Sequence, residues 1–251
     1  MKNRMSWKVR VLLCLIASSS AFSFALSSAS ARSVRTPEGN MPMVHWAILE
    51  STPGNMKAMG EIAAKTVGPQ AAQEAGTYML YGGVDESNRD VMRLLEIYEG
   101  YEAYRIHSTS EAFQDYRAAR FPILKSLRIL EVNGIVLEQK EEGVATVVVM
   151  RRYEVAPEKL WDYQRLAKSE AVRAVDEDEG VMGIFVTAEH DNPNIIHTME
   201  LYRDQEARER YMESESYRAF SEKATPMFLD ARTIENLPAN ITLSAKGLKK
   251  D

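Results

Sequence analysis

The sequence has little cysteine and few of the short signatures that mark common enzymes. Its 251 residues include one cysteine, Cys14, which lies in the predicted leader described below, so the mature chain has no thiol for a disulfide, a thiolate metal site or a nucleophile. Gly-x-Gly-x-x-Gly, Walker, Gly-x-Ser-x-Gly and His-Glu-x-x-His patterns are all missing. The four histidines are too scattered to suggest a metal triad, so we expect neither a metal nor a cofactor.

The first 31 residues have the pattern of a secretory signal peptide. Four basic residues precede an apolar stretch that serines interrupt, and Ala29-Ser30-Ala31 is a small-x-small cleavage site. We expect cleavage near Ala31 and a secreted or periplasmic protein without a stable membrane span. The alternative is an uncleaved anchor.

Basic residues are also few in the predicted mature chain. Loss of the signal leaves 27 Lys and Arg against 36 Asp and Glu, and no basic run is longer than the pairs Arg151-Arg152 and Lys249-Lys250. Nucleic acid and anionic membrane surfaces are therefore poor partners.

An internal repeat organises the rest of the sequence. The segment from Glu96 to Phe113 recurs 104 positions later, from Glu200 to Tyr217, without a gap. Residues at helix caps, prolines and glycines match at the same offset, which indicates a duplicated fold. One difference inside the repeat is that His107 of the first copy is Tyr211 in the second. Identical pairs within the segment include Glu96/Glu200, Tyr98/Tyr202, Ala103/Ala207, Ser110/Ser214 and Glu111/Glu215.

Periodicity predicts the order β-α-β-β-α-β in each copy. A disordered leader over 32–42 is expected to precede a first domain over 43–140, and a charged link leads to a second domain over 145–244. In the first copy we predict strands at 43–50, 78–84, 91–98 and 127–138, a helix over 53–74, and helical segments from Tyr101 and after Ser110. In the second copy we predict strands at 145–154, 181–188, 194–202 and 232–244, a helix from Pro157, and helical segments over 204–230.

This order predicts an α+β protein made of two ferredoxin-like repeats. Strands such as Thr146-Val147-Val148-Val149-Met150 are apolar on both faces, so both faces of each sheet must be covered. Helices cover one face. We expect the other faces of the two sheets to pack together as an intramolecular pseudo-dimer.

The repeated segment resembles the signature of the antibiotic biosynthesis monooxygenase family, whose members include quinol monooxygenases. The resemblance rests on Glu96, Tyr98, Ala103, His107, Ser110, Glu111 and Phe113, and it covers residues 43–140 well and 145–243 moderately. It implies a dimeric α/β barrel formed here within one chain. It further implies a monooxygenase that uses O2 on a small aromatic or quinol substrate, without metal or flavin, and that binds the ring away from bulk water.

Six residues are candidates for such a site. We predict His107 as a proton acceptor or relay and Arg93 as the partner of a phenolate or peroxide anion. Trp46, Tyr81, Tyr98 and Tyr104 are the predicted substrate-binding residues. Each also has a structural interpretation, as a helix-packing histidine, a solvent-facing arginine or core aromatics. Because Glu96 and Glu200 match in both copies, a structural hydrogen bond explains them better than catalysis.

Two other functions stay open. The first is a non-catalytic small-molecule-binding protein, since the second copy has lost the histidine. The second is haem binding or degradation. It is less supported, because haem-degrading relatives share an asparagine on the first strand, where this sequence has His45-Trp46. Further assembly into a homo-oligomer is also possible.

Overall fold

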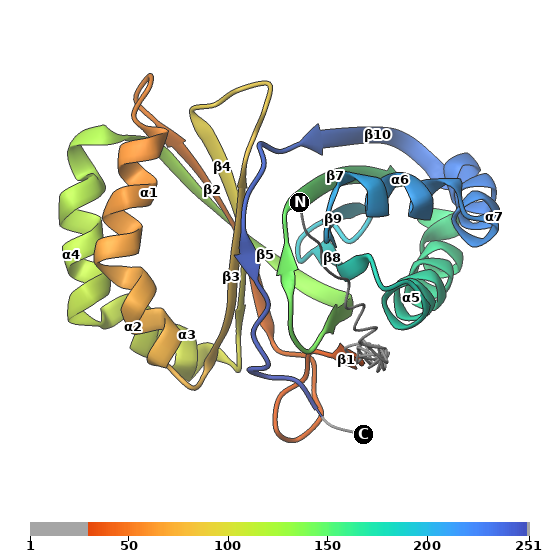
Figure 1. Ribbon diagram of the computed structural model, residues 1–251, viewed down its shortest axis with the longest axis horizontal. Helices are drawn as coiled ribbons and strands as arrows, with labels where there is room; N and C mark the ends of the chain where they lie inside the picture. The colour runs from red at the N-terminus through yellow and green to blue at the C-terminus, as the bar shows by residue number, and fades with distance from the viewer. Residues whose placement is uncertain (1–29, 250–251) are drawn as a thin grey trace, which may run out of the picture.

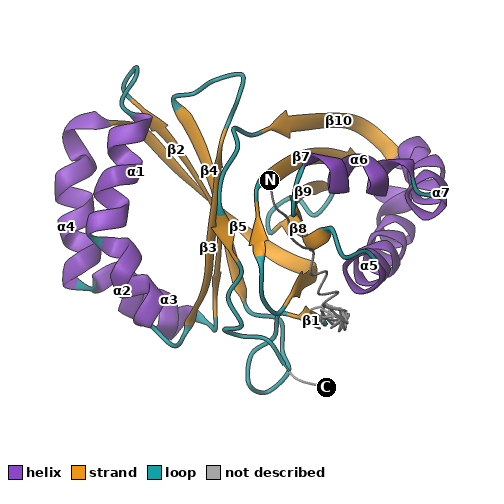
Figure 2. Ribbon diagram, in the orientation of Figure 1, coloured by secondary structure: helices purple, strands orange, loops and turns teal. Residues whose placement is uncertain are grey.

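The structure is a computed structural model that describes residues 30–249, so nearly all of the predicted signal peptide, including Cys14, lies outside the described residues. Two groups of helices lie on opposite sides of a strand layer (Figure 1 and Figure 2). Within the described range, no helix is long and apolar enough to cross a membrane.

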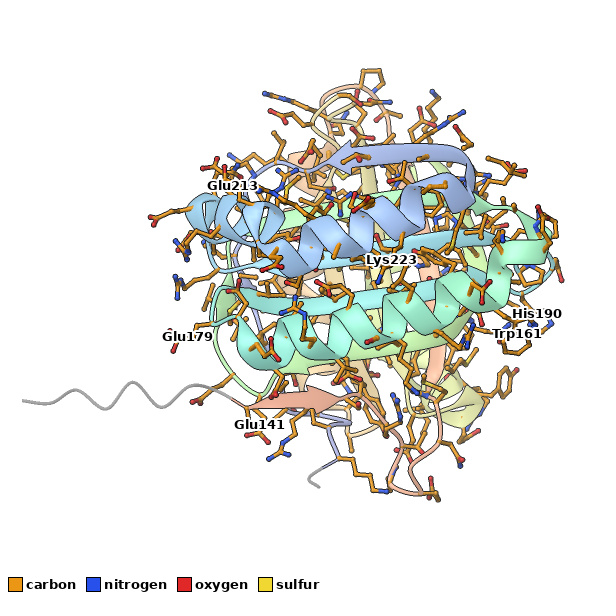
Figure 3. All side chains as sticks on the ribbon, turned by 90° about the vertical axis from the view of Figure 1, so that its right-hand side faces the viewer. Glu141, Trp161, Glu179, His190, Glu213 and Lys223 are labelled. Carbon is orange, nitrogen blue, oxygen red and sulfur yellow. The ribbon has the colours of Figure 1, made fainter. Side chains whose placement is uncertain are left out.

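Both repeats have the predicted order of elements. The first consists of β2 (Met43–Ser51), α1 (Met56–Lys65), α2 (Val67–Gln73), β3 (Thr77–Val84), β4 (Val91–Tyr98), α3 (Tyr101–Thr109), α4 (Glu111–Arg120) and β5 (Leu124–Lys140). The second consists of β7 (Val147–Val155), α5 (Leu160–Glu177), β8 (Val181–Glu189), β9 (Ile195–Tyr202), α6 (Gln205–Glu213), α7 (Glu215–Ala224) and β10 (Phe228–Glu235). Figure 3 shows α5, α6 and α7 covering one face of the second repeat.

The two repeats share one antiparallel sheet with the strand order β10-β7-β9-β8-β5-β2-β4-β3. Strand β5 joins them, because its first half pairs with β2 and its second half pairs with β8. At the other end, a bridge between Asp85 and Asn236 links the segments that follow β3 and β10. The sheet therefore curves back on itself, as expected for an internal pseudo-dimer.

Alternation along the strands divides the core into layers. Trp46 of β2 and Leu95 of β4 face an inner core, where they meet Phe185 and Met199 of the second repeat. Ala47 and Leu49 of β2 face the helices of their own repeat with Met59 of α1. The second repeat has a corresponding helix-facing core around Tyr163. The predicted packing of the two repeats through a shared inner face is confirmed, although their strands form one continuous sheet and not two.

The helix predicted over 53–74 is two helices, so this prediction is wrong in detail. Helix α1 ends at Lys65, and Thr66 between the helices has φ −114° and ψ −88°. Pro69 explains the break, because a proline has no N–H for the carbonyl of Lys65 four residues earlier and its ring clashes with that carbonyl.

The predicted disordered leader and the last predicted strand also differ from the structure. Ala31–Ser33 forms strand β1, which pairs with residues 138–140 of β5. Strand β10 ends at Glu235 because Pro238 cannot continue a hydrogen-bonded ladder, and two short strands, β6 (Val144–Ala145) and β11 (Ile241–Thr242), pair with each other nearby.

Candidate active site in the first repeat

A cavity of about 460 Å³ lies between the helix-facing side of the first repeat's sheet and helices α3 and α4. Strand alternation directs Ala47 and Leu49 of β2, and Leu94 and Glu96 of β4, to this side. Its walls are mainly apolar and aromatic, as in most small-molecule sites. The other lining residues are Tyr104, Ser108, Thr109, Phe113, Gln114, Tyr116, Arg117, Arg120, Leu127 and Ile129.

Glu96 is the acidic group of this cavity. Burial raises the pKa of its carboxyl to about 7, and the hydrogen bond from Tyr98 and the charge of Arg120 oppose this only in part. The Tyr98 hydroxyl donates to Oε2 of Glu96 over 3.3 Å. A carboxyl that titrates near neutral pH is able to accept a proton from a bound molecule and to release it again.

Arg120 is the basic group of the same cavity. It ends α4, is 5% exposed, and its guanidinium lies 4.5 Å from the centre of the Tyr116 ring. Its Nε has no hydrogen-bond partner within residues 30–249. A buried cation with a free donor is suited to an anion in the cavity.

The phenols around the cavity stay protonated near neutral pH. Burial, followed by the charge of Glu96, raises the pKa of Tyr104. Burial likewise raises the pKa of Tyr116, against the charge of Arg120. Tyr104 and Tyr116 therefore act as hydrogen-bond donors and ring surfaces here, not as bases.

The equivalent space in the second repeat is occupied by protein. Arg151 replaces Ala47, is 6% exposed, and forms an ion pair with Glu200, the counterpart of Glu96. The Tyr202 hydroxyl also donates to Glu200 over 2.6 Å. Tyr153, the counterpart of Leu49, stacks on Phe228 with ring centres 4.2 Å apart. The glutamate of the first repeat therefore lines a cavity, whereas the equivalent glutamate of the second repeat is held in an ion pair.

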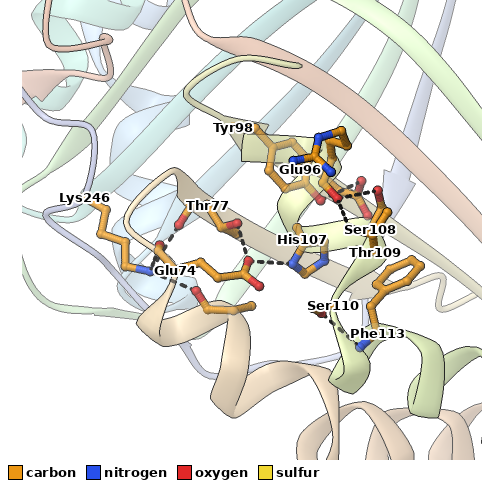
Figure 4. A network of polar contacts seen from close by, with 12 residues as sticks. Glu74, Thr77, Glu96, Tyr98, His107, Ser108, Thr109, Ser110, Phe113 and Lys246 are labelled. Atoms are coloured by element: carbon orange, nitrogen blue, oxygen red, sulfur yellow. Dashed lines mark hydrogen bonds and ion pairs between the residues drawn. The ribbon is translucent and has the colours of Figure 1, made fainter. Parts of the chain in front are cut away.

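His107 lies outside this cavity. Its ring is buried, and its Nδ1 is 2.8 Å from Oε2 of Glu74, next to the C-terminus of α2 (Figure 4). In the second repeat, the hydroxyl of Tyr211 donates to Glu170 of α5 over 2.9 Å. In both copies this position therefore joins a helix, α3 or α6, to a carboxylate at or in the helix before it in its repeat. This shared contact favours a structural role for His107.

Three of the other predicted residues face the opposite side of the sheet. The Trp46 indole donates to the Thr187 hydroxyl over 3.0 Å, in the inner core. The Tyr81 hydroxyl donates to Gln139 over 3.3 Å and accepts from the Ser244 N–H over 3.0 Å. Arg93 forms an ion pair with Asp85 over 2.8 Å. The fold does not bring these side chains together with His107.

Tyr98 and Tyr104 do lie near Glu96. Tyr104 lines the cavity and Tyr98 donates to the carboxylate, so their substrate-binding roles stay predictions that fit the geometry. Glu96 and Arg120 were not among the site residues predicted from the sequence. The signal for them was a difference between the copies, because Ala47 becomes Arg151 and Arg120 becomes Ala224 while the glutamate stays.

Comparison with known proteins places this fold among those of presumed monooxygenases. Residues 146–223 match the family model described as antibiotic biosynthesis monooxygenase. No curated protein matches the chain.

Solved structures match the chain over both repeats. A presumed monooxygenase from Lactobacillus acidophilus NCFM is 15% identical, with a TM-score of 0.75 over 82% of this chain and 97% of that one. A presumed monooxygenase from Fusobacterium nucleatum is 17% identical, with a TM-score of 0.75 over 84% of this chain and 98% of that one. An anthrone oxidase-like protein is 11% identical, with a TM-score of 0.53 over 86% and 96%. At these identities the likeness concerns the fold. The second repeat therefore matches the family model described as antibiotic biosynthesis monooxygenase, and both repeats share the β-α-β-β-α-β order of the solved structures.

Proposed function

We propose that the chain is a cofactor-independent monooxygenase that oxidises a small phenol or quinol with O2 in the cavity of the first repeat. The observation that carries this proposal is the pair of Glu96 and Arg120. A carboxyl with a pKa of about 7 and a buried guanidinium with a free Nε line one largely apolar cavity. The match of residues 146–223 to the monooxygenase family model supports the reaction class, and the cavity supports the substrate class.

The chemistry begins with deprotonation of the substrate. Ionised Glu96 accepts a phenolic proton, and Arg120 stabilises the resulting phenolate. An electron-rich phenolate transfers one electron to O2, and the two radicals combine to a peroxide anion near the same guanidinium. For a hydroquinone, one oxygen atom enters the ring and the other leaves as water, giving a hydroxyquinone. Both atoms of O2 and all electrons are then accounted for without an external reductant.

Oxygen uptake with a panel of hydroquinones and polycyclic phenols tests the proposal. We expect turnover above the autoxidation rate, with kcat/KM rising as pH increases through about 7, the pKa of Glu96. Glu96→Gln should lower kcat/KM by about 10²-fold or more, since general-base catalysis contributes on that order. Glu154→Gln, on β7 of the other repeat, serves as the matched control and should retain activity.

Two results would count against this site. Thermal stabilisation by phenols without oxygen uptake would support the binding-only function instead. If His107→Tyr lost turnover and Glu96→Gln stayed active, the proton acceptor would be His107, as predicted from the sequence, and not Glu96. We expect His107→Tyr to keep activity, because tyrosine makes the corresponding contact in the second repeat.

We also propose that the protein acts outside the cytoplasm. The basic start, the apolar stretch and the Ala29-Ser30-Ala31 site support export. Mass spectrometry of the protein recovered from the periplasm or medium should show an N-terminus near Arg32, whereas an intact N-terminus in the cytoplasmic fraction would contradict export.

A further inference from the structure

A second cavity of the first repeat collects sulfur and imidazole side chains. Met43 and His45 lie two positions apart on β2, so alternation directs them to one side of the strand, and Met41 lies just before it. All three line a cavity of about 420 Å³ together with His190. The remaining lining residues are Pro42, Val44, Glu131, Val132, Asn133 and Gly134. None of these residues lines the Glu96 cavity.

The fold brings His190 to this place from the second repeat. Strand β8 pairs with the second half of β5, and the His190 N–H, just beyond β8, donates to the Glu131 carbonyl over 3.0 Å. Glu131 is itself opposite His45 in the pairing of β2 with β5. Figure 3 shows His190 at the margin of the second repeat's helical face. Two histidines that are 145 positions apart in the sequence therefore border one cavity.

His45 has an unused nitrogen. The residue is 4% exposed, and its Nδ1 has no hydrogen-bond partner in the described part of the chain. Its ring packs edge-on against Tyr104, with ring centres 5.0 Å apart. Leaving a buried polar atom without a partner costs free energy, so a partner from outside the chain is expected.

The chemistry of the donors decides which ion fits. Thioethers are soft ligands that select Cu(I), and imidazole is compatible with it. Within residues 30–249, this cavity included, no group of three or more His, Cys, Asp or Glu side chains is placed to hold a metal ion. That finding disfavours a zinc-type site but does not concern methionine sulfur. Long, unbranched methionine side chains also adapt readily to a bound ion.

We propose that Met41, Met43 and His45, with His190 as a further ligand, form a binding site for Cu(I). The second repeat has no equivalent site. At the positions equivalent to Met41, Met43 and His45, the second repeat has Ala145, Val147 and Val149, which offer no side-chain donor. The proposal is independent of oxygenase activity, because none of its ligands is assigned a part in that reaction.

Anaerobic titration with Cu(I) against a chromophoric Cu(I) chelator tests the site. The protein is the full chain carrying Cys14→Ser, so that its only thiol cannot compete for the ion. We expect one Cu(I) per chain, with sulfur and nitrogen neighbours in the X-ray absorption spectrum. The double variant Met41→Leu/Met43→Leu keeps side-chain volume and should weaken binding at least tenfold. His45→Gln should weaken it to a similar extent.

Met212→Leu, in α6 of the second repeat, is the matched control and should bind Cu(I) like the parent. Equal affinity of the double leucine variant and the parent would overturn the proposal. A bound copper without sulfur neighbours would overturn it as well. Circular dichroism of each variant shows whether the fold is retained. His190→Gln changes an exposed position and therefore leaves the core untouched.

Discussion

At the scale of single residues, the most informative comparison is between Glu96 and Glu200. They occupy the same position in the two repeats, yet Glu200 is paired with buried Arg151 and Glu96 has only a hydrogen bond from Tyr98 and the more distant charge of Arg120. A residue on the neighbouring strand makes the difference: Ala47 or Arg151, two positions beyond the residue paired with the glutamate. Conservation of a residue between the copies therefore does not imply conservation of its role.

This difference predicts opposite effects of the same substitution on stability. The carboxyl of Glu96 has an ordinary pKa of 4.5 and a folded pKa of about 7, so the folded chain retains a proton that the unfolded chain loses between these values. Its contribution to stability therefore falls as pH rises from about 4.5 to 7, by up to about 3 kcal/mol. Glu96→Gln removes this penalty and should stabilise the protein at pH 8, with less effect at pH 4.5, as measured by urea unfolding.

Glu200→Gln is the comparison for that experiment. It leaves Arg151 buried without its anion, so we expect destabilisation by about 3 kcal/mol or more at pH 8. Equal effects of the two substitutions would show that the two glutamates have similar surroundings.

Ala47→Arg is expected to close the first cavity. The new guanidinium should pair with Glu96, as Arg151 pairs with Glu200, and occupy the space between β2 and α4. We expect loss of phenol binding in calorimetry and a fall of the Glu96 pKa, seen by NMR of the carboxyl carbon. Ala219→Arg, at an exposed position of α7 in the other repeat, is the control; unchanged phenol binding by Ala47→Arg would place the ligand elsewhere.

At the scale of elements, the C-terminal segment holds the helices of the first repeat in place. The ammonium group of Lys246 donates to the carbonyls of Ala71, Glu74 and Thr77, at and just beyond the end of α2 (Figure 4). A cation at a helix C-terminus satisfies carbonyls that have no partner in the helix and interacts favourably with the helix dipole. His107 reaches the side chain of the same Glu74 from α3.

Lys246→Ala should therefore loosen α2. We expect a loss of roughly 1–3 kcal/mol, the usual effect of removing hydrogen bonds from a charged donor. Hydrogen exchange of peptides covering 67–77 should become faster, while peptides from α5 should not change. Lys249→Ala, at an exposed neighbouring position, is the control, and equal protection of α2 in both variants would refute the tether.

The sequence predicted the elements better than the site. Repeated caps, prolines and glycines mark where chain direction changes, and these positions do not depend on which face of a strand is buried. The site depends on that face. Trp46 and Arg93 are suitable residue types on suitable strands, but alternation directs them away from the cavity, and one residue along, Ala47 and Leu94 face it. Arg120 enters the cavity only through the packing of α4, which no local pattern reveals.

At the scale of the whole molecule, the two repeats depend on each other. The inner core contains side chains from both, including Leu95 and Met199, and the two halves of β5 pair with different repeats. A separate first repeat would expose an apolar sheet face and a half-unpaired strand, both of which favour association.

Residues 43–140 and 144–249, expressed separately, should therefore not remain monomers. We expect each to be a dimer in sedimentation experiments or to be unfolded, whereas the full chain should unfold in a single transition. A stable, monomeric, folded half would contradict this dependence on a shared core. Mixing the two halves should restore a one-to-one complex with the far-ultraviolet circular dichroism of the full chain.

The single strand that belongs to both repeats has a consequence for how such a protein changes over generations. In a homodimer, every substitution appears in both pockets at once, so a pocket cannot be lost without losing its twin. Here one covalent chain encodes the two pockets separately. One repeat has the salt bridge of Arg151 and Glu200, while the other has an open cavity. A chain that carries both repeats can therefore change one half while the other half serves as its scaffold.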